Sequence, residues 1–223
     1  MFTQYDASRY NKLMHVISAA VLTLGLATIP QIALAEGWYG GLGFGNSKIK
    51  DDSTCSDAGS LFDPGYSCSV DTKDTGKKVF VGYQFNKNGA VQFGYADLGK
   101  FSANASGTSA GIPSTASADL KIKGFDLALV GSLPVTNEFS VLGQIGLFRW
   151  DVKVDASATG NLVAENQSAT GTDVAFGVGA QYDFSKTVGA RMEWERFKDV
   201  GKSDTTGKGD VDLLSLSLVF RFQ

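Results

Sequence analysis

The sequence predicts an all-β fold, an eight-stranded antiparallel up-and-down transmembrane β-barrel. Three observations predict it: an export signal at the N-terminus, eight segments in which large apolar residues alternate with small or polar ones, and connections that are alternately short and long. Alternation with a period of two indicates a strand with two different faces. A closed ring of strands pairs every backbone N–H and C=O group, as the interior of a bilayer requires.

The N-terminal segment is typical of a secretory signal peptide. Its features follow in the usual order: Arg9 and Lys12, the apolar stretch 16–29, and the cleavage site Ala33-Leu34-Ala35. An uncleaved anchor is the alternative, but Pro30 interrupts the stretch before it reaches bilayer-spanning length. We therefore expect a signal peptide at 1–35 and an outer-membrane barrel domain at 36–223.

Eight segments of the expected mature chain alternate in this way, and none of the mature chain looks helical. The predicted strands are residues 37–46, 78–86, 90–98, 124–134, 139–150, 173–184, 188–197 and 212–222. Bacterial barrels have an even number of strands, with the large apolar side chains toward lipid and the polar ones toward the lumen. The 27 glycines and 4 prolines agree with strands that bend and pack closely.

The connections predict which end of the barrel faces outward. We expect tight turns at 86–89, 135–138 and 185–187, and long loops at 47–77, 99–123, 151–172 and 198–211. Short periplasmic turns and long extracellular loops are the outer-membrane pattern. Aromatic residues near the short turns fit an interfacial girdle: Trp38, Phe85, Phe139, Phe184 and Phe222. Residues 101–118, rich in Ser, Ala, Gly and Thr, are expected to form a mobile surface loop.

The mature chain has two cysteines, Cys55 and Cys68, in the first long loop. In a secreted protein such a pair predicts one disulfide, with two free thiols as the alternative. Closing a loop of about 15 residues is worth roughly 3 kcal/mol in the chain-entropy model. We expect the bond to staple the loop without being needed for the barrel.

The chain resembles a known family, the OmpA-type outer-membrane β-barrel, over nearly all of residues 37–223. The residues that carry the resemblance are Trp38-Tyr39-x-Gly41, Val81-Gly82-Tyr83-Gln84, Phe93-Gly94-Tyr95-x-x-Leu98-Gly99, Phe176-x-x-Gly179-x-x-Tyr182, Ala190 to Trp194, and Leu214 to Phe222. The resemblance implies an eight-stranded barrel with a polar, largely filled interior. Because the sequence stops at Gln223, we expect the transmembrane domain alone, without the family's periplasmic peptidoglycan-binding domain.

The family's interior ion pairs look thinned in this chain. The resemblance places its acidic positions on Gln92 and Gln181 and its lysine on Val130, so that only the arginine is kept, as Arg191. Alternation puts Arg191 on the lumen face, and the tight turn at 185–187 places it across from Gln181. A guanidinium in a narrow lumen needs hydrogen bonds and a counter-charge. The predicted lumen network is therefore Arg191, Gln181, Glu193 and Asp126, with Glu195 as a further source of charge.

Sequence evidence for catalysis, cofactors or metals is weak. His15, the only histidine, lies in the predicted signal peptide, and hydrolases and acyltransferases of this size generally need histidine as the general base. Glu193 and Glu195 are the only local carboxylate pair, and we interpret them as lumen charges. The acidic loop 47–77 could hold calcium but lacks EF-hand spacing. We expect no enzyme, no cofactor and no metal site.

The sequence is compatible with two functions: a structural or surface-interaction barrel that displays long extracellular loops, and a small low-conductance pore. A third, an enzyme, is disfavoured because the mature chain has no histidine. Eight strands enclose a lumen about wide enough for side chains to fill, as the first requires. Many lumen positions are glycine or alanine, which could leave the water-filled space of a pore. The expected partners are outer-membrane lipids and lipopolysaccharide, the barrel assembly machinery, and a surface ligand at the loops. The net charge of -3 gives no reason to expect nucleic acid, and we expect a monomer.

Overall fold

The structure is a computed structural model that describes residues 36–50 and 54–222, with the side chain of Asp57 excepted. The predicted signal peptide, residues 1–35, lies outside the described residues. No helix in the described ranges is long and apolar enough to cross a membrane.

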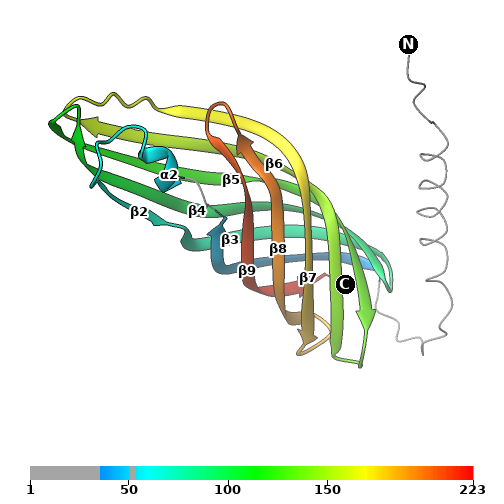
Figure 1. Cartoon of the computed structure of the whole chain (residues 1–223). Helices are drawn as coiled ribbons and strands as arrows, with labels where there is room; N and C mark the ends of the chain where they lie inside the picture. Colours follow the sequence, from blue (N-terminus) through cyan, green and yellow to red (C-terminus); the bar gives the residue numbers. More distant parts are fainter. Residues whose placement is uncertain (1–35, 51–53, 223) are drawn as a thin grey trace, which may run out of the picture. The chain divides into compact units, whose positions relative to one another are not determined.

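Eight long antiparallel strands form a closed ring (Figure 1). In chain order the elements are β1 (Gly37–Ile49), α2 (Thr54–Ala58), β2 (Ser67–Asp71), β3 (Lys73–Asn86), β4 (Gly89–Ser109), β5 (Ile112–Pro134), β6 (Phe139–Thr159), β7 (Gln167–Asp183), β8 (Val188–Lys202) and β9 (Gly207–Arg221). Neighbours in sequence are neighbours in space, and β1 closes the ring by pairing with β9. The prediction of an eight-stranded up-and-down barrel is confirmed.

The short strand β2 lies outside this ring of eight. It pairs with residues 102–106 of β4. This is the position that β3 would occupy if it stayed paired with β4 farther from the tight turns. Tight connections join β3 to β4, β5 to β6 and β7 to β8 at one end of the barrel, where they were predicted.

Three of the four predicted long loops are wrong, because the strands continue through them. The hairpin β4–β5 turns only at residues 110–111, β6 runs to Thr159, and the hairpin β8–β9 turns at residues 203–206. Residues 101–118, expected to be a mobile loop, are almost entirely strand. The alternation persists in these segments but with small or charged residues on the outer face, a pattern unlike the lipid-facing one.

The first connection, residues 50–72, holds the short helix α2, which the sequence analysis did not expect, and β2. The predicted Cys55–Cys68 disulfide joins them. This stapled loop is fastened to the β4–β5 hairpin, since Asp63 N–H donates to the Thr108 carbonyl and the Asp63 carboxylate accepts from Gly111 N–H at 2.9 Å. The Phe62 and Tyr66 rings stack at 5.8 Å.

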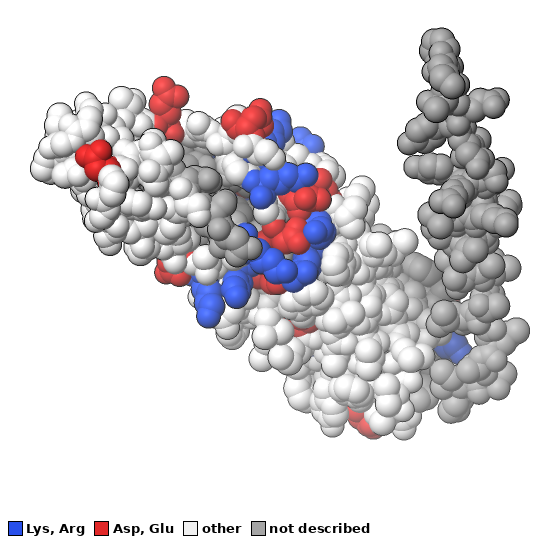
Figure 2. Space-filling view, in the orientation of Figure 1, with Lys and Arg blue, Asp and Glu red and all other residues white. Residues whose placement is uncertain are grey.

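The barrel has two zones, which differ in what their outer faces carry. In the belt, near the tight turns, exposed side chains are large and apolar, as at Leu129 and Ile145, each 60% exposed. Beyond it, in a part that we call the extension, the outer faces carry charged and small polar residues. The extension comprises residues 46–49, 67–77, 97–123, 148–172 and 196–212. Figure 2 shows the charged side chains gathered in a band next to a nearly uncharged region.

Candidate functional site

Alternate residues of every strand build the interior of the belt. It holds polar and charged side chains beside a buried, largely apolar cluster of Tyr39, Phe80, Ala90, Val130, Leu142 and Val219. Inward positions on β8 are Arg191, Glu193 and Glu195, all buried, while Met192 between them is 53% exposed on the outer face. Parity along the strand therefore places three charges on the lumen side at successive two-residue steps. This is the face that the sequence predicted for them.

Arg191 lies among hydrogen-bond acceptors and aromatic rings. Its Nε donates to Gln181 Oε1 at 2.8 Å, across the β7–β8 pair, and its Nη1 donates to Gln92 Oε1 at 3.0 Å. The guanidinium also lies 5.3 Å and 5.2 Å from the ring centroids of Tyr39 and Phe80, within cation–π range. Its nearest carboxylate is Glu193, at 3.8 Å.

The main counter-charge to the two glutamates comes from Lys78 on β3. Its Nζ donates to Glu193 Oε2 at 2.7 Å and to Glu195 Oε2 at 2.6 Å, which lie three strands away on β8. Lys78 and Arg191 together balance Glu193 and Glu195. Buried charges need such pairing, because desolvating an unpaired ion costs several kcal/mol.

Further bonds extend the network in both directions. Toward the tight turns, Gln181 Nε2 donates to Asp183 Oδ1 at 2.9 Å, and Asp183 forms an ion pair with Arg221 at 2.8 Å. Toward the extension, Gln144 Nε2 donates to Glu195 Oε1 at 2.6 Å. Hydrogen bonds and ion pairs thus link residues from Arg221 to Gln144 along much of the belt interior.

Asp126 faces the same lumen but takes a different place from the one expected. It lies on β5 opposite Gly94 of β4, and its carboxylate fills the space that a side chain at Gly94 would need. Among the described residues, no hydrogen bond joins Asp126 to Arg191. The structure therefore brings together Arg191, Gln181 and Glu193, with Asp126 to one side.

Lys78 is the functional residue that sequence reasoning missed. Lys78 begins the predicted strand 78–86, and the sequence alone predicts no role for it. It lies an even number of residues from the lumen-facing Gly82 and Gln84, so it shares their face of the strand. The expectation of a thinned charge cluster is wrong in this respect. The lysine position that the resemblance implied is Val130, but a lysine on another strand reaches the same interior.

Close packing leaves little free space around these charges. A Cβ at Gly82 would collide with the Tyr39 ring, so glycine is required there for the ring to cross the lumen. Two small cavities measure about 30 Å³ beside Arg191 and about 10 Å³ beside Asp126. Since a water needs roughly 10–15 Å³, each of the two has room for isolated waters only.

The interior of the extension is apolar. Phe148 and Phe197 lie with ring centroids 4.5 Å apart, and Trp150, whose Nε1 donates to Asp173 at 2.8 Å, packs in the same cluster. Further buried members are Leu98, Phe101, Ile122, Val152, Val200, Val211 and Leu213. This cluster covers the polar network from above.

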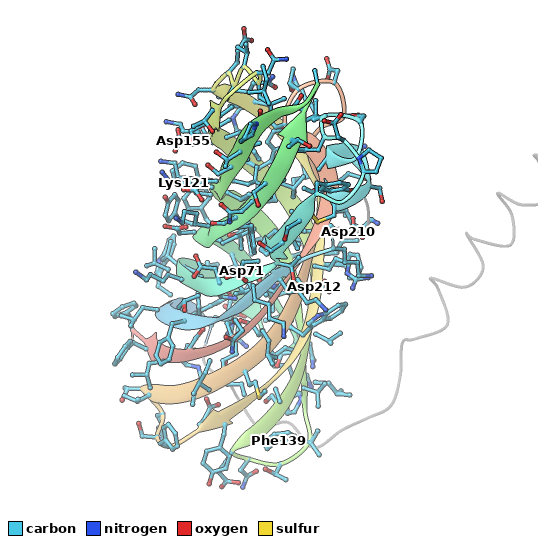
Figure 3. All side chains as sticks on the ribbon, turned by 60° about the vertical axis from the view of Figure 1, so that its left-hand side comes forward. Asp71, Lys121, Phe139, Asp155, Asp210 and Asp212 are labelled. Carbon is cyan, nitrogen blue, oxygen red and sulfur yellow. A yellow bond between two sulfur atoms is a disulfide. The ribbon has the colours of Figure 1, made fainter. Side chains whose placement is uncertain are left out.

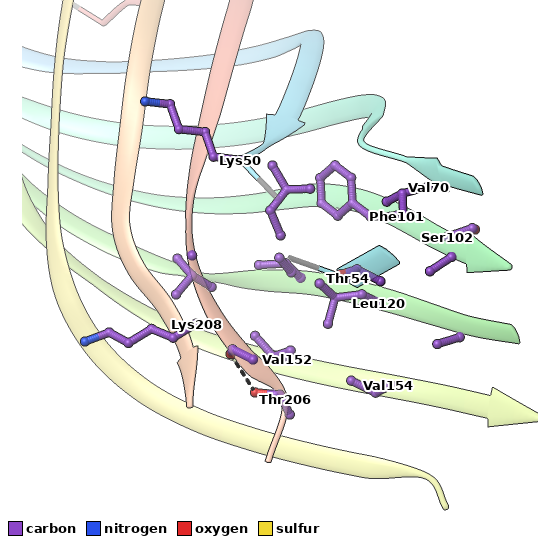
Figure 4. Close-up of a pocket in the computed structure, with 17 residues that line it drawn as sticks. Lys50, Thr54, Val70, Phe101, Ser102, Leu120, Val152, Val154, Thr206 and Lys208 are labelled. Carbon is purple, nitrogen blue, oxygen red and sulfur yellow. Dashed lines mark hydrogen bonds between the residues drawn. The ribbon is translucent and has the colours of Figure 1, made fainter. Parts of the chain in front are cut away.

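A pocket of about 260 Å³, the mouth pocket, lies beside this cluster (Figure 4). Phe101, Leu120 and Val152 line it, with Lys50 and Lys208 also in its lining. Among the described residues, no group of three or more His, Cys, Asp or Glu side chains could hold a metal ion.

Structural comparison shows the same fold in small outer-membrane barrels. The attachment invasion locus protein Ail of Yersinia pestis, solved with the heparin analogue sucrose octasulfate, has a TM-score of 0.51 at 17% identity and covers 84% of this chain and 100% of its own. Neisserial surface protein A has a TM-score of 0.54 at 12% identity and covers 83% and 97%.

Sequence comparison identifies the family. Outer membrane protein A of Yersinia pseudotuberculosis serotype I is 28% identical over 208 residues, which is 92% of this chain and 54% of the relative. That of Serratia marcescens is 27% identical over 215 residues, 92% and 55%. The chain therefore spans about half the length of the curated relatives it matches. The model of the OmpA-like transmembrane domain matches residues 33–223. The chain belongs to the OmpA-like transmembrane domain family and is a β-barrel of the Gram-negative outer membrane.

Proposed function

We propose that this chain is a non-catalytic, monomeric outer-membrane barrel that strengthens the envelope, holds its extension on the cell surface, and has a lumen closed to ions. It is exported by a signal peptide cleaved after Ala35 and inserted by the barrel assembly machinery. Lipids and lipopolysaccharide surround the belt, and a surface ligand would bind at the hairpin tips of the extension.

One observation carries the closed lumen: Lys78 spans the barrel interior to Glu193 and Glu195, with an apolar cluster above. An ion on its way through would have to break two ion pairs and then pass a layer of buried aromatic rings. Because both glutamates accept a hydrogen bond from Lys78, neither is placed as a free base, which supports a non-catalytic role.

Conductance in planar lipid bilayers tests this proposal against the small low-conductance pore. We expect the parent to show no resolved channel openings. Arg191→Ala removes the guanidinium beside Gln181 and Gln92 and should destabilise the barrel and permit brief openings. Arg149→Ala, on the exposed outer face, is the control. Steady openings of the parent, unchanged in Arg191→Ala, would favour the pore and refute the plugging role of the network.

Orientation needs a separate test. An epitope inserted between Ala110 and Gly111, at the tip of the β4–β5 hairpin, should bind antibody on intact cells. A second epitope in the tight turn at residues 135–138 should bind only after the outer membrane is permeabilised. The reverse result would place the extension in the periplasm.

A further inference from the structure

The outer wall of the extension carries a groove just above the belt, which we call the wall groove. It arises where the wall is broken. β3 pairs with β4 only as far as Lys77–Asp97, β2 resumes the pairing at Asp71–Ser102, and Gly99 between them has a φ of 89°. A residue with a side chain would be strained at that φ, so glycine allows the bulge. The groove measures about 570 Å³.

Positive charge dominates the lining of the wall groove. Five lysines face three aspartates there: Lys77, Lys100, Lys121, Lys123 and Lys153, against Asp74, Asp97 and Asp151. In the described part of the chain, Lys100 forms an ion pair with Asp119, and Lys121 with Asp155. The other three lysines form none there. Figure 3 shows Lys121 and Asp155 close together on this side of the barrel.

Strand register gathers three of these lysines side by side. Lys100 lies directly across from Lys121, and Lys121 directly across from Lys153, so three lysines form one row over three adjacent strands. Like charges directly opposite each other destabilise a sheet. Asp119 and Asp155 compensate Lys100 and Lys121 in part, while Lys153 has no ion pair among the described residues. An anion bound at the row would remove the remaining repulsion.

The distance of the wall groove from the apolar belt indicates which kind of anion would bind there. Along the outer face of β5, Phe125 is the last apolar residue of the belt, and Lys123 and Lys121 follow. At ~3.4 Å per residue and a strand tilt of ~40°, they lie roughly 5 Å and 10 Å above Phe125. The headgroup layer is about 5–7 Å thick on each side of a bilayer, so the lysines lie within it and just beyond it.

The surface directly below fits acyl chains. Phe125 stacks with Phe93 at 5.8 Å and contacts Tyr95 at 5.2 Å, which gives a continuous aromatic patch on the lipid-facing side. Exposed Arg149 lies across from Phe125 on β6, at the border between patch and groove.

We propose that the wall groove binds the phosphate groups of one lipopolysaccharide molecule, whose acyl chains lie on the Phe93–Tyr95–Phe125 patch. The inference rests on the proposed orientation, because only the outer leaflet holds lipopolysaccharide. The lysines beyond headgroup height distinguish this ligand from a phospholipid, since its phosphorylated sugars extend further from the acyl chains. The bound phosphates neutralise the lysine row.

The test measures binding of lipid A carrying two phosphates to the protein purified in detergent and freed of lipid. The variant Lys77→Gln/Lys123→Gln/Lys153→Gln removes the three lysines that lack an ion pair. Surface lysines near anionic lipid are worth enough that the variant should bind about 100-fold more weakly. The matched control, Lys48→Gln/Lys202→Gln/Lys208→Gln, removes the same charge from β1, β8 and β9. It should bind as the parent does.

Three results would overturn the proposal: equal binding by the groove variant, an equal loss in the control, or displacement of lipid A by equimolar phosphatidylglycerol or inorganic phosphate. Parent-like thermal melting of the groove variant shows that any loss is not unfolding. Because the assay in detergent does not depend on orientation, its failure would leave the surface-epitope result standing. A reversed epitope result would instead refute the proposed function.

Discussion

The belt and the extension are made of the same strands and have opposite radial polarity. Along β5, the outer face carries Leu129, Leu127 and Phe125 in the belt, and then Lys123 and Lys121 in the extension. The inner face changes in the reverse sense. Asp126 lies inside the belt, and Ile122, only 2% exposed, lies inside the extension.

Strand geometry therefore determines only which side chains share a face. The surroundings, lipid or water, determine which face is apolar. In hydrocarbon an apolar outer face gains nothing by turning inward, so the interior is free to hold charge. In water the apolar face must be buried, and the extension is packed like a small soluble barrel.

Removing the central cation should be the most damaging change in the belt. Lys78→Met leaves Glu193 and Glu195 facing each other without their shared partner, and breaking a buried ion pair typically costs 3–5 kcal/mol. Urea unfolding in lipid vesicles measures the loss. Lys77→Met, one residue away on the exposed outer face, is the control and should change the free energy of unfolding by less than about 0.5 kcal/mol. Equal effects would mean that the network contributes nothing to stability.

The extension should respond to loss of packing instead. Phe148 is 1% exposed, and Phe148→Ala should cost about 3–5 kcal/mol through lost burial and a residual cavity. The same unfolding assay measures it, with the adjacent exposed Arg149→Ala as the control. A cost below about 1 kcal/mol would show that the apolar interior of the extension is not a packed core.

Placing charge on the outer face should separate the two zones directly. Leu129→Arg in the belt exposes a guanidinium to hydrocarbon and should cost about 2–4 kcal/mol near the midplane. Asn104→Arg, on the exposed outer face of the extension, should stay within about 0.5 kcal/mol. If both substitutions were tolerated equally, the boundary between belt and extension would be misplaced.

The disulfide should matter least to the barrel. Cys55→Ser opens a staple that closes only the first connection, so the heat-modifiable gel mobility of the folded barrel should not change. Proteolysis within residues 54–71 should become faster, because the loop loses the covalent link between α2 and β2. Ser69→Ala, in the exposed part of β2, is the control. Failure of Cys55→Ser to assemble would contradict the local role.

The ring of eight strands could be predicted because alternation in the belt is strong and the tight turns are short. The ends of the strands could not be predicted. Belt strands carry their large apolar residues on the outer face, whereas Phe101, Ile122 and Val152 in the extension lie on the inner face. Their parity is correct for strands with an apolar inner face. The break between β2 and β3 depends on the register against β4, which a single sequence does not reveal.

Part of the lumen network could be predicted from the sequence. Parity placed Arg191 and Glu193 on one face, and the tight turn placed Arg191 opposite Gln181. Parity also pointed inward at Lys78, but only the closed ring shows that its side chain meets Glu193 and Glu195, which lie 115 and 117 residues away. The place of Asp126 beside Gly94 likewise depends on the pairing of β4 with β5.

The pairing of β1 with β9 has a consequence for biogenesis. Residues 39–49 find their second neighbour only in residues 211–221, which are made much later than β1. At a synthesis rate of about 5–20 residues per second, roughly 10–40 s pass between the synthesis of β1 and that of its partner strand. Throughout this interval the nascent chain carries an open strand edge and a lipid-facing apolar surface, both prone to aggregate in water. The cell must therefore shield the chain until residues 211–221 have reached the membrane, because the ring cannot close without them.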